Sequence, residues 1–295
     1  MPPTMRASLP LLLLSLAASP AVPVAPSPRP PEPRPPEVLA LPGYRLHLLV
    51  DEEVDPDRLG QLGRPGVVLW LRTRSNMLRS SIAERLGRFG EAYVRLRPPV
   101  LEAHAAQLRF APRAGVWLEE GALGGAGVYR MGTRRLALTV TGPLTPERVE
   151  RIRRARPAQL LWHPGEPPDL VAWSTFAQLP GAKLLSVEGA AVAPWEGCDA
   201  LYPHGAARGL AVAVDLRGSA EAFTFPSGCR LGARVRVSPR ISDAAIARIL
   251  ASNPSAELEL EVGSDEEAVR AAVGLLDRLE AASATGRGLG PGVER

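Results

Sequence analysis

Recurring β–α units predict an α/β protein with a parallel sheet, and three observations lead to this fold class. Segments 135–165 and 234–264 both run strand, short turn, helix, proline and strand, and 46–73 follows the same order. Apolar strand-like runs recur at intervals of roughly 25 residues. They occupy a region of about 240 residues, which suits a (β/α) TIM-like barrel. An open, horseshoe-like α/β repeat is the alternative, although the leucine and asparagine pattern of leucine-rich repeats is absent.

The N-terminal segment predicts export. Arg6 precedes a short apolar run from Leu9 to Leu16, and small residues follow, which is the layout of a secretory signal peptide over 1–21. Cleavage after Ala21 is expected, with Ala18 as the other position. An uncleaved N-terminal anchor is the alternative, but the apolar run is too short for a membrane-spanning helix. We therefore expect a periplasmic or extracellular protein without a transmembrane helix after cleavage.

Composition divides the rest of the chain into three parts. Segment 22–41 is rich in proline, which favours extended backbone and predicts a stiff linker. A single α/β repeat domain is expected over 42–282. The Gly-rich segment 283–295 is expected to be a flexible tail.

Ten strands are predicted within the domain, and eight of them are expected to form the barrel core with the others as decorations. The predicted strands are 46–50, 67–72, 92–97, 116–119, 136–141, 160–163, 183–187, 210–215, 233–237 and 258–262. A short additional strand is predicted at 200–202.

The helices between the strands have recognisable starts and stops. Thr145 and Ser242 are expected N-caps, because a hydroxyl can accept from the first unpaired backbone N–H groups. Pro157 and Pro254 should end the two helices that follow. The clearest helix is the last one, predicted over 266–281.

Several predicted strands alternate apolar and charged residues, whereas parallel strands covered on both faces are continuously apolar. The charged set is Arg45, His47, Arg95, Arg97, Arg234, Arg236, Glu257, Glu259 and Glu261. Unpaired buried charges are very costly, so this face must form an ion-pair network inside a barrel or a solvated concave surface. Structural pairing without ligand binding is the favoured interpretation.

Charge and composition exclude some function classes. The formal net charge is +4, and acidic residues are interspersed with the basic ones, so no strong field of one sign is expected. Lys183 is the single lysine, which indicates a coding bias toward arginine rather than nucleic-acid binding. The arginine-rich helix from Arg148 to Arg156 could contact an anionic polymer, or form a solvated helix face.

Ligands of such folds bind at the carboxyl ends of the strands, where carboxylates and tryptophans suggest a carbohydrate site. The catalytic candidates among the acids are Glu119, Glu120, Glu188 and Asp215. The ligand-binding candidates are Asp51, Arg72, Arg97, Trp162 and His204.

His163 ends the strand LLWH and is a further catalytic candidate, as a general base. Strand periodicity places Trp162 and His163 on opposite faces, so one of them should face the helices. A structural role at a strand end is the favoured alternative for His163. No HExxH motif or comparable ligand spacing occurs, so neither a metal site nor a cofactor is predicted.

Cys198 and Cys229 are the only cysteines, and export makes a disulfide between them plausible. Two thiols buried in the core are the alternative.

Together these features predict an exported envelope or extracellular protein that is carbohydrate-active or a divergent glycoside hydrolase-like protein. The alternative is a non-catalytic binding or scaffold module of the envelope. The expected partners are a glycan or envelope polymer, or an envelope protein, and not nucleic acid.

Overall fold

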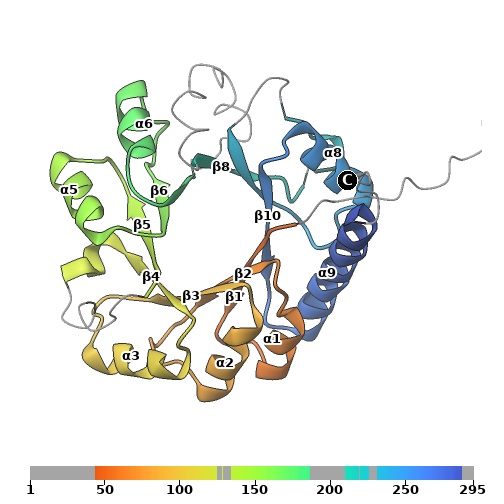
Figure 1. Ribbon diagram of the computed structural model, residues 1–295, viewed down its shortest axis with the longest axis horizontal. Coiled ribbons are helices and arrows are strands. Elements are labelled where there is room, and N and C mark those ends of the chain that lie inside the picture. Colours follow the sequence, from red (N-terminus) through yellow and green to blue (C-terminus); the bar gives the residue numbers. More distant parts are fainter. Residues whose placement is uncertain are drawn as a thin grey trace, which may run out of the picture. The chain divides into compact units, whose positions relative to one another are not determined.

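Ten parallel strands close into a barrel in the computed structural model, which describes residues 44–124, 128, 134–186, 210–218, 220–225 and 231–287. The strands are β1 (Leu46–Asp51), β2 (Val67–Arg72), β3 (Glu91–Leu96), β4 (Gly115–Glu119), β5 (Leu136–Thr141), β6 (Gln159–His163), β7 (Ala182–Leu185), β8 (Leu210–Asp215), β9 (Gly232–Arg236) and β10 (Ala256–Val262). Each strand pairs with its sequence neighbours, and β10 pairs with β1 to close the wall (Figure 1).

This architecture confirms the predicted α/β TIM-like barrel and excludes the open repeat. The expectation of eight core strands with decorations is wrong, because all ten strands belong to the wall. The strand predicted at 200–202 lies outside the described residues, as do the signal peptide, the linker and the two cysteines.

Helices surround the barrel on its outside (Figure 1). They are α1 (Pro56–Leu62), α2 (Ser80–Arg85), α3 (Glu102–Gln107), α5 (Pro146–Ala155), α6 (Leu170–Ala177), α8 (Asp243–Ser252) and α9 (Glu266–Arg287). Short 3-10 turns supplement them: η1 (Leu86–Arg88), η2 (Leu108–Phe110), η3 (Glu120–Gly124) and η6 (Ala220–Ala222). None of the helices within the described ranges combines the length and apolar character needed to cross a bilayer.

The helix boundaries agree with the capping signals in the sequence. The Thr145 side chain accepts from the Arg148 N–H at the start of α5, and the Ser242 side chain accepts from the Ala245 N–H at the start of α8. Both helices end before the prolines that follow them. The last helix, α9, extends to Arg287 rather than ending at Ala281.

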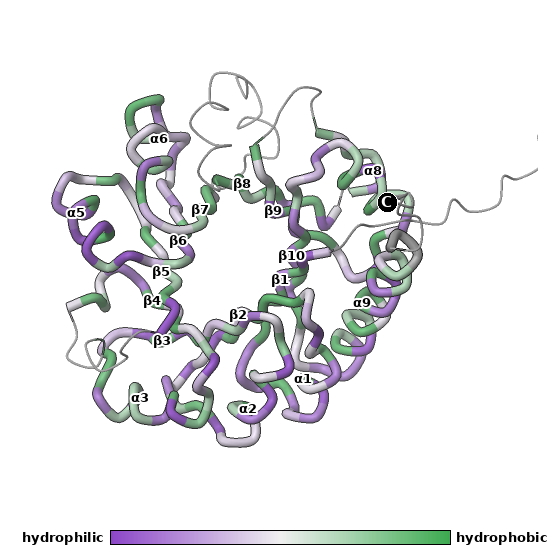
Figure 2. The backbone as a smooth tube through the Cα atoms, in the orientation of Figure 1, coloured by the Kyte–Doolittle hydropathy of each residue, from purple (hydrophilic) through white to green (hydrophobic). Residues whose placement is uncertain are grey.

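The main hydrophobic core lies between the barrel wall and the helices. Alternate residues of the strands supply it, as Leu46, Leu48 and Val50 do in β1. The helices contribute buried side chains such as Ile152 of α5 and Ile246 of α8. Figure 2 shows hydrophilic and hydrophobic residues mixed within the wall, which agrees with one face packing on the helices and the other facing inward.

Candidate functional site

The interior face of the barrel is partly accessible to water. Successive strand residues point to opposite faces, so the residues between the core positions point inward. Several of these inward residues are only half-buried although they lie in the middle of their strands: Leu49, Thr139, Leu161, Ala211 and Ala213. Eight strands enclose an interior that side chains just fill, and a wider barrel can leave room for a ligand. We call this interior space the lumen.

One side of the lumen is aromatic. Trp70 of β2 stacks on Tyr93 of β3 with ring centroids 4.8 Å apart, and it meets Trp117 of β4 edge-on at 5.3 Å. These rings belong to a small apolar cluster that is separate from the main core. Trp117 is half-buried, and its Nε1 donates to Thr139 Oγ1 at 2.7 Å. This ring is therefore the aromatic surface most open to the lumen among these three.

A buried histidine joins the first and last strands. His47 of β1 is 0% exposed; its Nδ1 accepts from Trp70 Nε1 at 2.9 Å, and its Nε2 lies 2.7 Å from Glu257 Oε2. Because Nδ1 accepts, the proton of the neutral ring is on Nε2, which donates to the carboxylate. Burial, reinforced by the charge of Arg234, lowers the pKa of His47 to about 4. The neutral ring is thus a structural link at neutral pH, not a proton donor poised for chemistry.

Arg234 of β9 is the most buried charge in this part of the lumen, with its side chain only 6% exposed. Its guanidinium lies over the Trp70 ring at 5.5 Å and 3.8 Å from Glu257. The pKa of Glu257 is lowered to about 2 despite its burial, because His47, Arg234 and Arg45 all favour the charged form. These charges stabilise one another and hold β9, β10 and β1 together.

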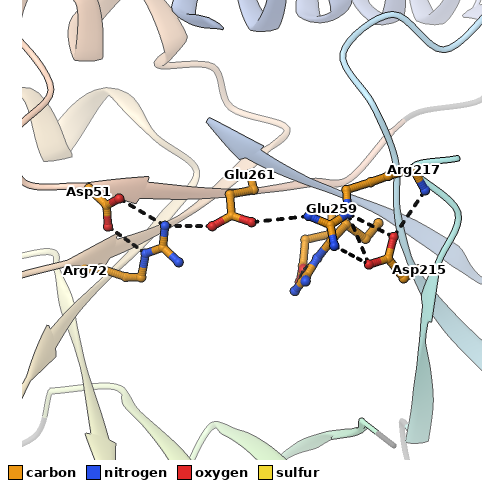
Figure 3. Close-up of polar contacts among 7 residues, drawn as sticks. Asp51, Arg72, Asp215, Arg217, Glu259 and Glu261 are labelled. Atoms are coloured by element: carbon orange, nitrogen blue, oxygen red, sulfur yellow. Dashed lines mark hydrogen bonds and ion pairs between the residues drawn. The ribbon is translucent and has the colours of Figure 1, made fainter. Parts of the chain in front are cut away.

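A chain of ion pairs runs along the carboxyl end of the strands (Figure 3). Arg72 holds Asp51 with two hydrogen bonds of 2.7 and 3.1 Å and reaches Glu261 at 2.8 Å. Arg217 lies 3.7 Å from the same Glu261 and binds Asp215 at 2.6 Å. Hydrogen bonds from Arg217 lower the pKa of Asp215. The predicted ion-pair network inside the barrel is therefore present, and three of the predicted site residues, Asp51, Arg72 and Asp215, are part of it.

A second polar sector lies across β3 to β6. Arg95 binds Glu119 at 2.6 Å while its guanidinium lies over the Trp117 ring at 5.1 Å. Next to this group, Thr141 of β5 is in register with His163 of β6. The alternation of β6 directs His163 inward, because its neighbour Trp162 is buried on the opposite face. Glu119 and His163 thus lie on the lumen side of the wall.

Two predicted site residues lie in the helix layer instead. Trp162 is 1% exposed, donates from Nε1 to Gly142 O at 2.8 Å and packs against Phe176. The ring packs against the helices and its surface is not exposed to the lumen. Glu120 follows the end of β4 and is held by Arg148 and Arg151 of α5 at 2.9 and 3.0 Å, on the outside of the wall. It is a structural counter-ion and not part of the lumen.

The remaining candidates are less informative. Arg97 follows β3 and is exposed; its backbone is held by Asn76, which accepts from the Arg97 N–H and donates to its carbonyl, both at 2.7 Å. Glu188, His204, Cys198 and Cys229 fall outside the described residues, so their predicted roles remain predictions. Within the described part of the chain, no group of three His, Cys, Asp or Glu side chains is arranged to hold a metal ion.

Comparison with protein-family models and with curated proteins finds no match for this chain. The functional argument therefore rests on the geometry of the lumen and its carboxyl end.

Proposed function

We propose that this protein is an exported binding protein of the cell envelope, whose lumen binds a hydroxyl-rich ligand such as a glycan without cleaving it. The sequence suggests two functions, a carbohydrate-active enzyme and a non-catalytic binding module, and we favour the binding module. It is supported by the state of the carboxylates, the composition of the lumen and the signal-peptide pattern predicted from the sequence.

The pairing of the carboxylates carries the proposal. Four acids at or near the carboxyl ends of the described strands each have an arginine within 2.8 Å: Asp51, Glu119, Asp215 and Glu261. Glycoside hydrolysis requires a carboxylic acid that keeps its proton near neutral pH, and this state needs a raised pKa. Among these four acids the effect is resolved for Asp215, whose pKa is lowered by hydrogen bonds from Arg217. The arrangement therefore favours binding over acid catalysis.

The lumen also contains the groups that recognise sugars. The half-buried Trp117 ring offers an apolar surface, and the paired arginines and carboxylates around it keep unused hydrogen-bonding capacity for hydroxyl groups. Because these polar groups already have partners, they would bind hydroxyls in fixed positions.

Calorimetric titration of the mature protein with chitotetraose, cellotetraose and maltotetraose, combined with assays for released reducing ends, tests this function. We expect 1:1 binding of at least one glycan and no product. Leu161→Trp, which fills the lumen, should weaken binding at least tenfold, whereas Leu170→Trp on the exposed start of α6 should leave it unchanged. Release of reducing ends, or equal binding by both variants, would contradict the proposal.

Export is tested separately, by N-terminal sequencing of the protein recovered from the periplasm of an expressing bacterium. Cleavage at the expected site gives a mature chain that begins at Val22, and cleavage at the other position gives one that begins at Ser19. An intact Met1 would show that the segment acts as an anchor or is not recognised.

A further inference from the structure

A cavity lies on the outside of the barrel, between the outer face of β4 and β5 and the helix α5. Its volume is about 600 Å³. The lining residues Val116 and Leu118 alternate in β4 with the lumen residues Trp117 and Glu119. The barrel wall thus separates this cavity from the lumen.

The cavity has an apolar part and a polar part, of which the apolar part is the larger. Its described apolar lining consists of Val116, Leu118, Leu123, Val128, Leu136 and Ala155. They come from β4, η3, β5, α5 and Val128, which lies between η3 and β5. An apolar cavity of this size falls within the range of roughly 300 to 1,000 Å³ that is usual for small-molecule sites.

Arginines surround the apolar lining. Arg134 contributes a guanidinium that donates to the carbonyls of Leu108, Ala111 and Ala114. Arg151 and Arg154 project from α5, where they occupy neighbouring turns of one face. The cavity therefore combines an apolar interior with positive charge at its edge.

This positive charge is not fully balanced. Glu120 is shared between Arg148 and Arg151, at 2.9 and 3.0 Å, so one carboxylate serves two guanidinium groups. Arg154 pairs with Glu150 at 3.0 Å, but both side chains are exposed, and such surface pairs contribute little. An incoming anion could replace Glu150 at Arg154 at small cost.

We propose that this cavity binds a single-chain amphiphile with an anionic head, such as a fatty acid, with the alkyl chain inside and the head at Arg154 and Arg151. The small volume excludes a protein segment with its own fold, and the charge excludes a cationic head. This site is independent of the glycan site proposed for the lumen.

Calorimetric titration of the mature full-length protein with dodecanoate, below its micelle concentration, tests the site. We expect saturable 1:1 binding. Arg154→Glu should weaken it at least tenfold, because a charge-assisted hydrogen bond is replaced by repulsion. Arg153→Glu makes the same charge change on α5 at an exposed position outside the cavity lining and should alter binding less than twofold. Leu123→Trp, which fills the cavity, should also weaken binding.

Ligand variants test the two halves of the site. Dodecanol and butyrate should both bind much more weakly than dodecanoate, since one lacks the charge and the other the chain. Absence of dodecanoate binding, or binding that is insensitive to Arg154→Glu and Leu123→Trp, would overturn the proposal. A third result would also overturn it: no dodecanoate binding, together with binding to phosphatidylglycerol vesicles that Arg153→Glu and Arg154→Glu weaken equally. That result would show that the exposed face of α5 is attracted to membranes and that the cavity is not a binding site.

Discussion

Acidification should destabilise the barrel through His47, and the size of the effect follows from its burial. The folded protein lowers the pKa of this histidine from 6.5 to about 4, so the unfolded chain binds the proton more tightly. The contribution of neutral His47 to the free energy of unfolding is therefore fully present above the unfolded pKa of 6.5, and it is lost as the pH falls toward 4. A shift of this size corresponds to about 3 kcal/mol in total, of which about 2 kcal/mol should be lost between pH 7 and pH 5. Glu257 contributes little in this window, because its depressed pKa matters only below about 4.5.

The variant His47→Gln isolates this effect. The amide of Gln can accept from Trp70 and donate to Glu257 as the neutral ring does, but it does not titrate. Urea denaturation at pH 7 and pH 5 gives the free energy of unfolding at each pH. The decrease from pH 7 to pH 5 should be smaller in this variant than in the unaltered protein, by about 2 kcal/mol. His104→Gln, in α3 outside the lumen, should keep the steep dependence that His47 produces. Identical pH dependence with and without His47 would refute the assigned protonation state.

Four further substitutions test the structural roles assigned above, each by denaturant titration. Gly181→Ala should cost about 1 to 3 kcal/mol, because the backbone there has φ +84° and an added Cβ would lie 2.3 Å from Pro157 O. Glu120→Gln should cost about 2 kcal/mol, since it leaves two guanidinium groups without their carboxylate, while Glu150→Gln should cost less than about 0.5 kcal/mol because its pair is exposed. Trp162→Phe should cost about 1 to 2 kcal/mol through the lost Nε1 hydrogen bond and leave glycan binding unchanged; reduced binding would return this residue to the site.

Local sequence signals were sufficient to locate the elements of the wall. Each of the ten predicted strands corresponds to a strand of the barrel within two residues at either end, because apolar alternation and proline stops act locally. The number of strands in the barrel was not predictable in this way. Closure depends on strand tilt and stagger, which are properties of the whole sheet.

The candidate site was predictable in its polarity but not in its contacts. Alternation identified the charged inward face, yet the His47–Glu257 contact joins residues 210 positions apart and exists only because β10 closes on β1. Periodicity also showed that Trp162 and His163 must point oppositely, but only the register with β5 decides which one faces inward. Glu120 was assigned to the site because it follows a strand end, whereas the turn into η3 directs it to α5.

The inward side chains differ in size between the two sides of the barrel, and under the proposed function this difference decides where a ligand would lie. On the side formed by β9, β10, β1, β2 and β3, long side chains fill the lumen and contact one another: Arg234, Glu257, His47, Trp70 and Tyr93. On the side formed by β5, β6 and β8, the inward residues are shorter and half-buried: Thr139, Leu161, Ala211 and Ala213. A charged side chain that already has its partners resists rearrangement, because separating a buried pair is costly. A ligand should therefore occupy the side with short residues, next to Trp117. Substitutions on the ionic side should then change the free energy of unfolding, whereas enlarging Ala211 or Ala213 should weaken binding first.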